Sequence, residues 1–152
     1  MTEPRNNRGA SKQDYETPWE LISAIEHKFG QLDWDLACTL ENGKAPRGFT
    51  PEDDSLSRNW AECDGHLWLN PPFADIAPWA KKCAESGSRV TMLVPASIDS
   101  NWFRDYVYGK ATVVVVSPRI SFDGRNSFPK PCMLCLYGRE ITTTQLMLWR
   151  WK

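Results

Sequence analysis

The first strong pattern along the chain is a helical repeat of apolar residues near the N-terminus. The residues on its apolar face are Leu21, Ile22, Ile25 and Phe29. Thr17 is a suitable N-cap, Pro18 suits the first helical position, and Glu20 completes a capping box. Gly30 then fits a left-handed stop. This pattern predicts a helix over 18–29.

The rest of the chain alternates between short apolar runs and helical or turn-rich segments. Strands are expected at 32–36, 66–70, 89–94, 111–116 and 132–137. Helices are expected at 74–85 and 101–108, and a long loop, with at most a short helix around 56–60, at 38–64. The C-terminal segment after Thr142 fits either an edge strand or a helix.

This alternation of strands and helices predicts an α/β fold with a mostly parallel sheet flanked by helices. Ligands in such folds bind beyond the carboxyl ends of the strands, which is where Asp35 and Asn70 fall. The interval between the first two strands is too short for the usual intervening β-α units. We therefore expect a trimmed Rossmann-like sheet.

A length of 152 residues suits one domain, expected at 14–152, after a polar segment at 1–13 that is typical of a disordered tail. Apolar runs are too short to span a membrane, and we expect no signal peptide and a cytoplasmic location. The five cysteines are expected as free thiols. Cys132 and Cys135 have metal-binding spacing but lie in an apolar strand without further ligands, so no metal site is expected.

The tetrapeptide Asn70-Pro71-Pro72-Phe73 is the most informative chemical motif. Two prolines remove two backbone donors and leave carbonyl acceptors beside the Asn70 amide oxygen. Such acceptors suit an amino group on a planar ring, such as N6 of adenine, whose nitrogen is a poor nucleophile until both hydrogens are held. Phe73 offers a face for a base rotated out of a duplex. Taken alone, the motif also fits a strand-ending loop with a core aromatic residue.

An ordered series of motifs resembles the phage-type DNA N6-adenine methyltransferases, a Dam-like family, over roughly residues 14–138. The motifs are Tyr15-Glu16-Thr17-Pro18, Asp35-Leu36-Ala37-Cys38, the segment 49–56, Trp68-Leu69 with the tetrapeptide, Leu93-Val94-Pro95-Ala96 and Arg119-Ile120-Ser121-Phe122. The resemblance implies an S-adenosylmethionine-dependent methyltransferase fold and methyl transfer to adenine N6 in double-stranded DNA, with Asn70, Pro71, Pro72 and Phe73 as the catalytic motif.

The resemblance also implies that the Tyr15 to Pro18 segment and the loop after Asp35, including Ala37, contact S-adenosyl-L-methionine. Thr17 and the helix N-terminus offer donors to the carboxylate of the cofactor, and Asp35 can accept from its ammonium group. Asp53 or Asp54, with Asp54 preferred, is the candidate for the ribose hydroxyls. The turn after Asp35 lacks the glycines usual in Rossmann-like methyltransferases, the nearest being Gly43.

A net charge of −1 gives no global attraction to DNA, so binding requires local basic groups. Arg119, Arg125 and Lys130 lie in or next to a turn-rich segment at 121–131 and are candidate phosphate contacts. The tail residues Arg5, Arg8 and Lys12 would add weak, salt-sensitive affinity.

Three alternatives stay open: a methyltransferase acting on RNA, one acting on a protein amide nitrogen, and a catalytically inactive DNA-binding relative. A hydrolase is disfavoured by the lack of clustered ligands or an activated nucleophile. The target sequence, the role in protection from restriction and the oligomeric state stay undetermined, although a GATC-like site and a monomer are favoured.

Overall fold

The computed structural model describes residues 15–138 and 144–152, and the predicted tail at 1–13 lies outside these ranges. The first helix is α2 (Trp19–Phe29), close to its expected bounds, with Leu21, Ile22 and Ile25 buried. The predicted capping box is wrong. Pro18 is the N-cap residue and no side chain caps the helix. Thr17 lies one residue before the N-cap, and its hydroxyl instead accepts a hydrogen bond from Asn70 Nδ2.

The other helices begin or end slightly inside the predicted ranges. They are α3 (Ala77–Ser86) and α4 (Asn101–Tyr106). α3 starts after residue 74 because a turn comes first, in which the Asp75 amide donates to the Pro72 carbonyl. Pro78 then occupies the first helical turn, a position that tolerates proline. The long loop contains three short 3₁₀ turns: η1 (Pro51–Asp53), η2 (Ser55–Ser57) and η3 (Trp60–Glu62).

Seven strands form one sheet in the order β2-β1-β3-β4-β6-β5-β7. They are β1 (Trp34–Asp35), β2 (Arg47–Gly48), β3 (His66–Leu69), β4 (Arg89–Pro95), β5 (Thr112–Ser117), β6 (Cys132–Leu136) and β7 (Leu146–Arg150). β2 was not predicted, since two residues carry no periodic signal. β7 resolves the C-terminal alternative in favour of an edge strand.

The expectation of a mostly parallel sheet is wrong, because the sheet is mixed. β6 lies between β4 and β5 and is antiparallel to both. The chain leaves β5 through the loop 118–131 and returns directly beside it, without the crossover helix that a parallel partner requires.

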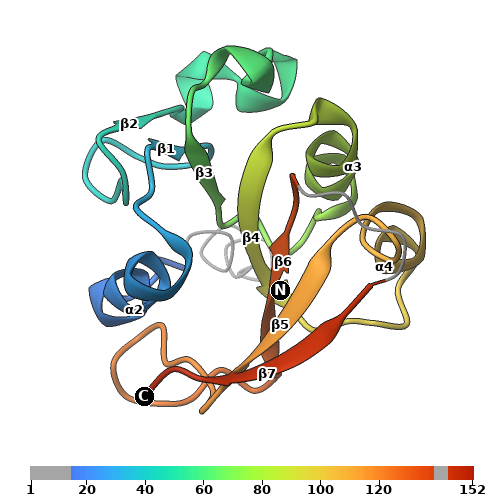
Figure 1. Cartoon of the computed structure of the whole chain (residues 1–152). Coiled ribbons are helices and arrows are strands. Elements are labelled where there is room, and N and C mark those ends of the chain that lie inside the picture. The colour runs from blue at the N-terminus through green and yellow to red at the C-terminus, as the bar shows by residue number, and fades with distance from the viewer. Residues whose placement is uncertain (1–14, 139–143) are drawn as a thin grey trace, which may run out of the picture.

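Helices cover both faces of the sheet, α2 on one face and α3 with α4 on the other (Figure 1). Each face has its own hydrophobic core. Ala80, Cys83 and Val107 of the α3 and α4 side pack with strand residues such as Val90 and Met92. On the opposite face, the buried residues of α2 pack with Trp68, Leu93 and Val114, which alternate along the strands with the first set. None of the described helices is long and apolar enough to cross a membrane.

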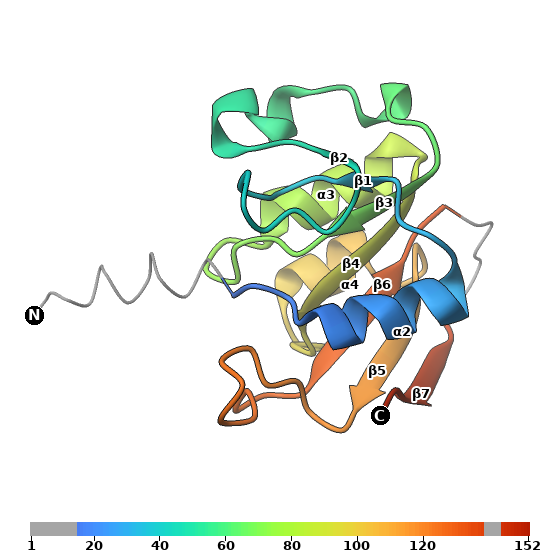
Figure 2. The same cartoon turned by 90° about the vertical axis from the view of Figure 1, so that its left-hand side faces the viewer.

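Four chain segments gather where β1, β3, β4 and β5 end. The first three strands are parallel to one another, and β5 has the same direction because β6 is antiparallel to both β4 and β5. The segments that follow these strands therefore emerge at one edge of the sheet. The N-terminal segment before α2 reaches the same edge (Figure 2), so distant parts of the sequence can build one site there.

Candidate active site

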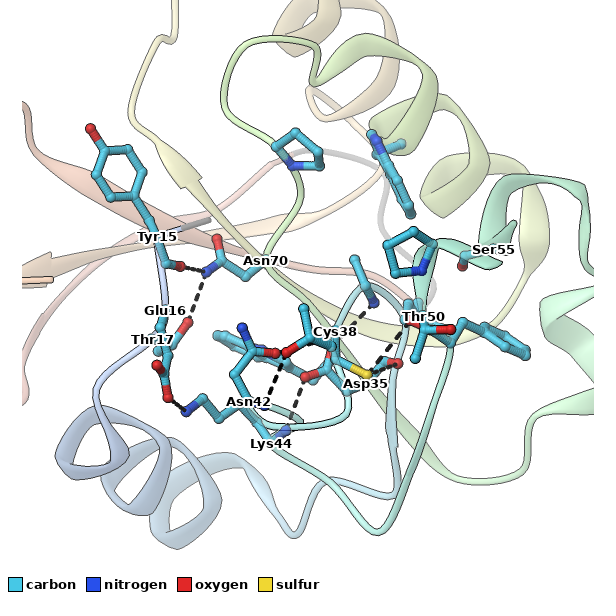
Figure 3. Close-up of a pocket in the computed structure, with 18 of the residues that line it drawn as sticks. Tyr15, Glu16, Thr17, Asp35, Cys38, Asn42, Lys44, Thr50, Ser55 and Asn70 are labelled. Atoms are coloured by element: carbon cyan, nitrogen blue, oxygen red, sulfur yellow. Dashed lines mark hydrogen bonds and ion pairs between the residues drawn. The ribbon is translucent and has the colours of Figure 1, made fainter. Parts of the chain in front are cut away.

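A cavity of about 340 Å³ opens at the carboxyl ends of β1 and β3 (Figure 3). Its walls come from the segment before α2, the loop after β1, the η1 and η2 turns, and the turn after β3. The lining residues are 15–17, 35–39, Asn42, Lys44, 49–51, 54–56, Trp68, Asn70, Pro72 and Trp79. The volume lies within the range of small-molecule and cofactor sites, about 300–1,000 Å³.

Asn70 follows β3 directly and its amide group is held in one orientation. The Nδ2 atom donates to the Tyr15 carbonyl at 2.6 Å and to the Thr17 hydroxyl at 2.9 Å. Because the Tyr15 carbonyl can only accept, the nitrogen must face it and the oxygen must face away. The Oδ1 atom is buried and has no hydrogen-bond partner among the described residues. A buried acceptor without a donor is costly, so this atom is one that a ligand N–H would satisfy.

The two prolines after Asn70 divide between the core and the cavity. Pro71 is buried, and no described backbone amide or side chain donates to its carbonyl. Pro72 lines the cavity, and its carbonyl accepts from Asp75. Of the acceptors expected at this turn, the Asn70 amide oxygen and the Pro71 carbonyl have no donor among the described residues.

Phe73 lies in a cluster of four aromatic rings rather than against the cavity itself. Its ring centroid is 5.4 Å from that of Tyr15, 6.0 Å from that of Phe122 and 5.7 Å from that of Phe128. Tyr15 comes from the segment before α2, whereas Phe122 and Phe128 come from the loop 118–131. A second cavity of about 430 Å³, lined by Tyr15, Glu16 and residues of that loop, lies beside the cluster.

Asp35 organises the loop that follows β1. Its Oδ1 accepts from the Ala37 amide at 3.1 Å and its Oδ2 from the Lys44 amide at 3.0 Å. Burial raises the pKa of Asp35 to about 6, although both amides and the charge of Lys44 oppose the rise. The carboxyl group thus lines the cavity and holds both ends of the loop 37–44.

Close backbone approach at Gly48 takes the place of a glycine-rich turn after Asp35. The Phe49 amide donates to the Asp35 carbonyl, which brings β2 against the end of β1. A Cβ atom on Gly48 would lie 2.6 Å from Cys38 Sγ and 2.8 Å from the Asp35 carbonyl oxygen. Only glycine fits there without a shift of the cavity wall.

Most of the predicted cofactor-contacting residues lie at the cavity. Tyr15, Thr17, Asp35, Ala37 and Asp54 all line it, whereas Pro18 does not.

The geometry also separates the two neighbouring acids. Asp53 uses its carboxylate to accept from the Thr50 amide and hydroxyl, at 2.8 and 3.1 Å. Asp54 alone of the pair lines the cavity.

The predicted DNA contacts lie together on the loop 118–131, and Arg119, Arg125 and Lys130 are all exposed. Arg119 donates to the Pro129 carbonyl at 3.0 Å and so braces the loop. Asp123 accepts from the amides of Arg125 and Asn126, which shapes the loop tip. Arg5, Arg8 and Lys12 lie outside the described residues.

Lys44 is a charged residue of the site that sequence reasoning missed, as it missed Trp68 and Trp79. It sits in a loop without apolar periodicity, yet it is only 5% exposed. Its Nζ donates to Glu16 at 2.7 Å and lies 4.2 Å from the Trp19 ring centroid. No local sequence signal marks a lysine as buried, because its partners lie about 25 residues earlier in the chain.

The fold and the site together define an α/β protein with a preformed cavity next to a turn that offers acceptors to an amino group. The family model described as DNA N-6-adenine-methyltransferase (Dam) matches residues 5–134, and the chain belongs to this family. The chain is also 28% identical over 121 residues to a DNA N-6-adenine-methyltransferase of Escherichia phage T1. That match covers 78% of this chain and 50% of the relative, so the chain spans about half the length of the curated relative.

Proposed function

We propose that this chain transfers a methyl group from S-adenosylmethionine to the N6 amino group of adenine in double-stranded DNA. The observation that carries the proposal is the buried Oδ1 of Asn70, which has no hydrogen-bond partner among residues 15–138 and 144–152. The amide nitrogen of Asn70 is fixed by Tyr15 and Thr17. Family membership supports the same chemistry, because a methyltransferase family implies a methyl donor and an acceptor.

The cavity beside Asn70 fits an adenosyl cofactor in size and in the chemistry of its walls. Trp68, Trp79, Asp54 and Asp35 all line this cavity. In this proposal the two tryptophans supply apolar surface, Asp54 accepts from ribose hydroxyls, and Asp35 accepts from an ammonium group. Bound there, S-adenosylmethionine would supply an electrophilic methyl group on its sulfonium sulfur.

In this proposal the protein acts on the amino group by holding its two hydrogens. Asn70 Oδ1 and the Pro71 carbonyl accept one N–H each, which favours a pyramidal nitrogen with its lone pair directed at the methyl donor. The new N–C bond forms as the S–C bond breaks, and the nitrogen then loses one proton to solvent. The same two acceptors stabilise the positive charge that develops on the nitrogen, and they are in place before the reaction. No covalent enzyme intermediate is required.

The aromatic cluster is the proposed position of the target base. A base that leaves the duplex needs a flat apolar surface, and Phe73 provides one beside Asn70. In this structure the rings of Phe122 and Phe128 lie against Phe73. We therefore propose that they give way to the base when the loop 118–131 engages DNA through Arg119, Arg125 and Lys130.

The fold supports a trimmed Rossmann-like methyltransferase architecture. β1, β3 and β4 are parallel neighbours, and the cavity lies beyond the carboxyl ends of β1 and β3, where open α/β sheets bind ligands. Between β1 and β3 the chain contributes only β2 and three 3₁₀ turns. In the proposed architecture this short connection stands where other Rossmann-like methyltransferases have β-α units.

The test is transfer of radiolabelled methyl from S-adenosylmethionine to unmethylated duplex DNA, followed by nucleoside analysis. N6-methyladenine is the expected product, and its sequence context would identify the target site. Asn101→Ala is a matched control for Asn70→Ala, because Asn101 is an exposed residue of α4 away from the cavity. Transfer to RNA or protein but not to DNA would overturn the proposed substrate, and DNA binding without cofactor binding would indicate an inactive relative.

A further inference from the structure

Lys44 is a buried cation at the proposed cofactor site. Among the described residues that line the cavity it is the single lysine or arginine, whereas Glu16, Asp35 and Asp54 supply carboxyl groups. Its side chain is 3% exposed. Burying an ammonium group is unfavourable unless partners use its three N–H donors. The partners of Lys44 should therefore distinguish a structural role from a ligand-binding role.

The visible partners of Lys44 use only part of its donor capacity. One N–H goes to Glu16 at 2.7 Å, and the side chain of Glu16 is 52% exposed. The face of Trp19, at 4.2 Å from Nζ, adds a cation–π contact but no acceptor atom. An ion pair with a half-exposed carboxylate contributes little stability, so a purely structural role does not account for the burial.

Lys44 and Asp35 also form one unit at the cavity wall. The Lys44 amide donates to Asp35 Oδ2 at 3.0 Å, so the loop that carries the cation is fastened to the carboxylate. Trp19, beneath the Lys44 ammonium, is the first residue of α2, whose N-terminal amides add positive potential. A cationic residue and a buried carboxylate therefore line the same cavity, and this pair of charges is complementary to the zwitterion of an α-amino acid.

We infer that Lys44 binds the α-carboxylate of the amino-acid end of S-adenosylmethionine, while Asp35 accepts from the α-ammonium group. This inference rests on the proposed function and assigns the end of the cavity that holds the methionine moiety. Glu16 keeps its hydrogen bond to Lys44 and holds Nζ in place, while a remaining N–H of Lys44 donates to the carboxylate. The adenosine moiety then lies toward Asp54 and Trp79.

The experiment compares two ligands with calorimetric titration. S-adenosylhomocysteine carries the amino-acid end, whereas 5′-methylthioadenosine keeps the adenosine and sulfur but lacks it. Lys44→Met removes the charge at nearly constant length. Lys28→Met is the matched control, because Lys28 also lies over aromatic rings, at 5.7 Å from Phe29, but is exposed and outside the cavity.

The expected result is a loss specific to the amino-acid end. Lys44→Met should weaken S-adenosylhomocysteine binding by roughly 10- to 100-fold, as for a hydrogen bond to a charged group. Binding of 5′-methylthioadenosine should be unchanged, which also shows that the variant is folded. Lys28→Met should alter neither affinity.

Other outcomes would overturn the inference in distinguishable ways. If Lys44→Met weakens both ligands equally, or neither, Lys44 does not bind the carboxylate, although the cofactor site itself stands. Equal affinity of the wild-type protein for the two ligands would show that the amino-acid end is not recognised, without any need for a variant. If the wild-type protein binds neither ligand, the proposed function fails and the inference fails with it.

Discussion

The two sides of the Asn70 turn are built by different forces. On the cofactor side, Asp35 fastens the loop 37–44 with two amide hydrogen bonds, and Gly48 lets β2 pack against it. On the base side, the four rings of Tyr15, Phe73, Phe122 and Phe128 meet at tilted and edge-to-face angles. Two of these rings belong to the loop 118–131, most of whose residues are exposed.

This difference suits the two proposed ligands. Directional hydrogen bonds and a buried carboxyl group fix one geometry, as a small cofactor with several polar groups requires. Aromatic packing has weak directional preferences and can be exchanged for stacking on a base. The cofactor side is therefore preformed and the base side adaptable. Asn70 stands between the two sides: its nitrogen is held by Tyr15 and Thr17, and its oxygen has no partner within the described part of the chain.

Asn70→Ala should give the largest effect, because it removes the group that joins the two sides. We expect kcat to fall about 100- to 1,000-fold, the usual effect of losing one preorganised transition-state contact. Affinity for S-adenosylhomocysteine should stay close to that of the wild type, measured by titration calorimetry. Turnover near the wild-type value would contradict the role of the amide oxygen.

Phe73→Ala tests the base side alone. Loss of a stacking surface should raise the dissociation constant for duplex DNA by about 10- to 100-fold, corresponding to roughly 1–3 kcal/mol per stacked base. Fluorescence of 2-aminopurine at the target position would report base rotation, and cofactor affinity should not change. Phe29→Ala is the control, since Phe29 packs on Trp149 away from the cavity. Equal effects of both variants would count against stacking.

Gly48→Ala tests the preformed cofactor side. The added Cβ would meet Cys38 Sγ and the Asp35 carbonyl, so we expect a loss of about 1–3 kcal/mol in the free energy of unfolding and weaker cofactor binding. Gly43→Ala is the matched control, because its Cβ would come no closer than 3.7 Å to any neighbour. Denaturant titration measures the free energy of unfolding of the two variants, and titration calorimetry measures their cofactor affinity. Equal stability of the two variants would show that the wall tolerates movement.

The ionisation of Asp35 should make cofactor binding depend on pH. Its pKa of about 6 is raised from 3.8 by burial, so ionisation is unfavourable in the free protein and a bound ammonium group should favour it. Affinity for S-adenosylhomocysteine should rise about tenfold in total between pH 5 and pH 7, most of it below pH 6. The affinity for 5′-methylthioadenosine should be flat over that range, and a parallel rise for both ligands would exclude this role.

The same pKa shift has an opposite consequence for the stability of the free protein. Because the folded pKa lies above the unfolded value of 3.8, this group stabilises the fold fully below pH 3.8. That contribution is lost as the pH rises through about 6. Cofactor binding should offset the loss, so the increase in melting temperature on adding S-adenosylhomocysteine should be larger at pH 7 than at pH 5.

Arg125→Gln should have the smallest effect and belongs to the base side. If Arg125 contacts one phosphate, the slope of log affinity against log salt should decrease by about 1, with no change in target sequence. Arg104→Gln is the control, since Arg104 pairs with Asp105 at 2.7 Å on α4. An unchanged salt slope for Arg125→Gln would remove this residue from the DNA interface.

Local patterns in the sequence predicted the elements that bury apolar residues. The face of α2, the strands β3 to β6 and the turn at Asn70 all follow from periodicity or proline chemistry, and their bounds agree closely with the structure. β1 lies inside the strand expected at 32–36 and is shorter than expected, whereas β2 and the direction of β6 were not accessible in this way. Strand pairing depends on which segment lies beside a strand, and the two residues of β2 carry no periodic signal.

The candidate residues also divide into those that local sequence patterns reveal and those that depend on long-range contacts. Asn70, Asp35 and Asp54 could be selected from the sequence because each follows a strand end or belongs to a recognisable motif, and the structure brings them to one cavity. Thr17 was also selected, as a helix cap and as a cofactor contact; it lines the cavity but caps no helix, and its hydroxyl accepts from Asn70. That contact joins positions 53 residues apart, so no local rule could reveal it.

The sequence by itself determined the layered α/β architecture, the place of the acceptor turn and the family, because these depend on side-chain period, proline geometry and ordered motifs. Only the tertiary structure decided that Asn70 directs its amide oxygen away from Tyr15 and Thr17. It also placed Lys44 in the cavity wall and brought the loop 118–131 against Phe73. Each of these features depends on contacts between segments that are distant in the chain, and the free energy of such contacts is set by packing rather than by the residues taken one at a time.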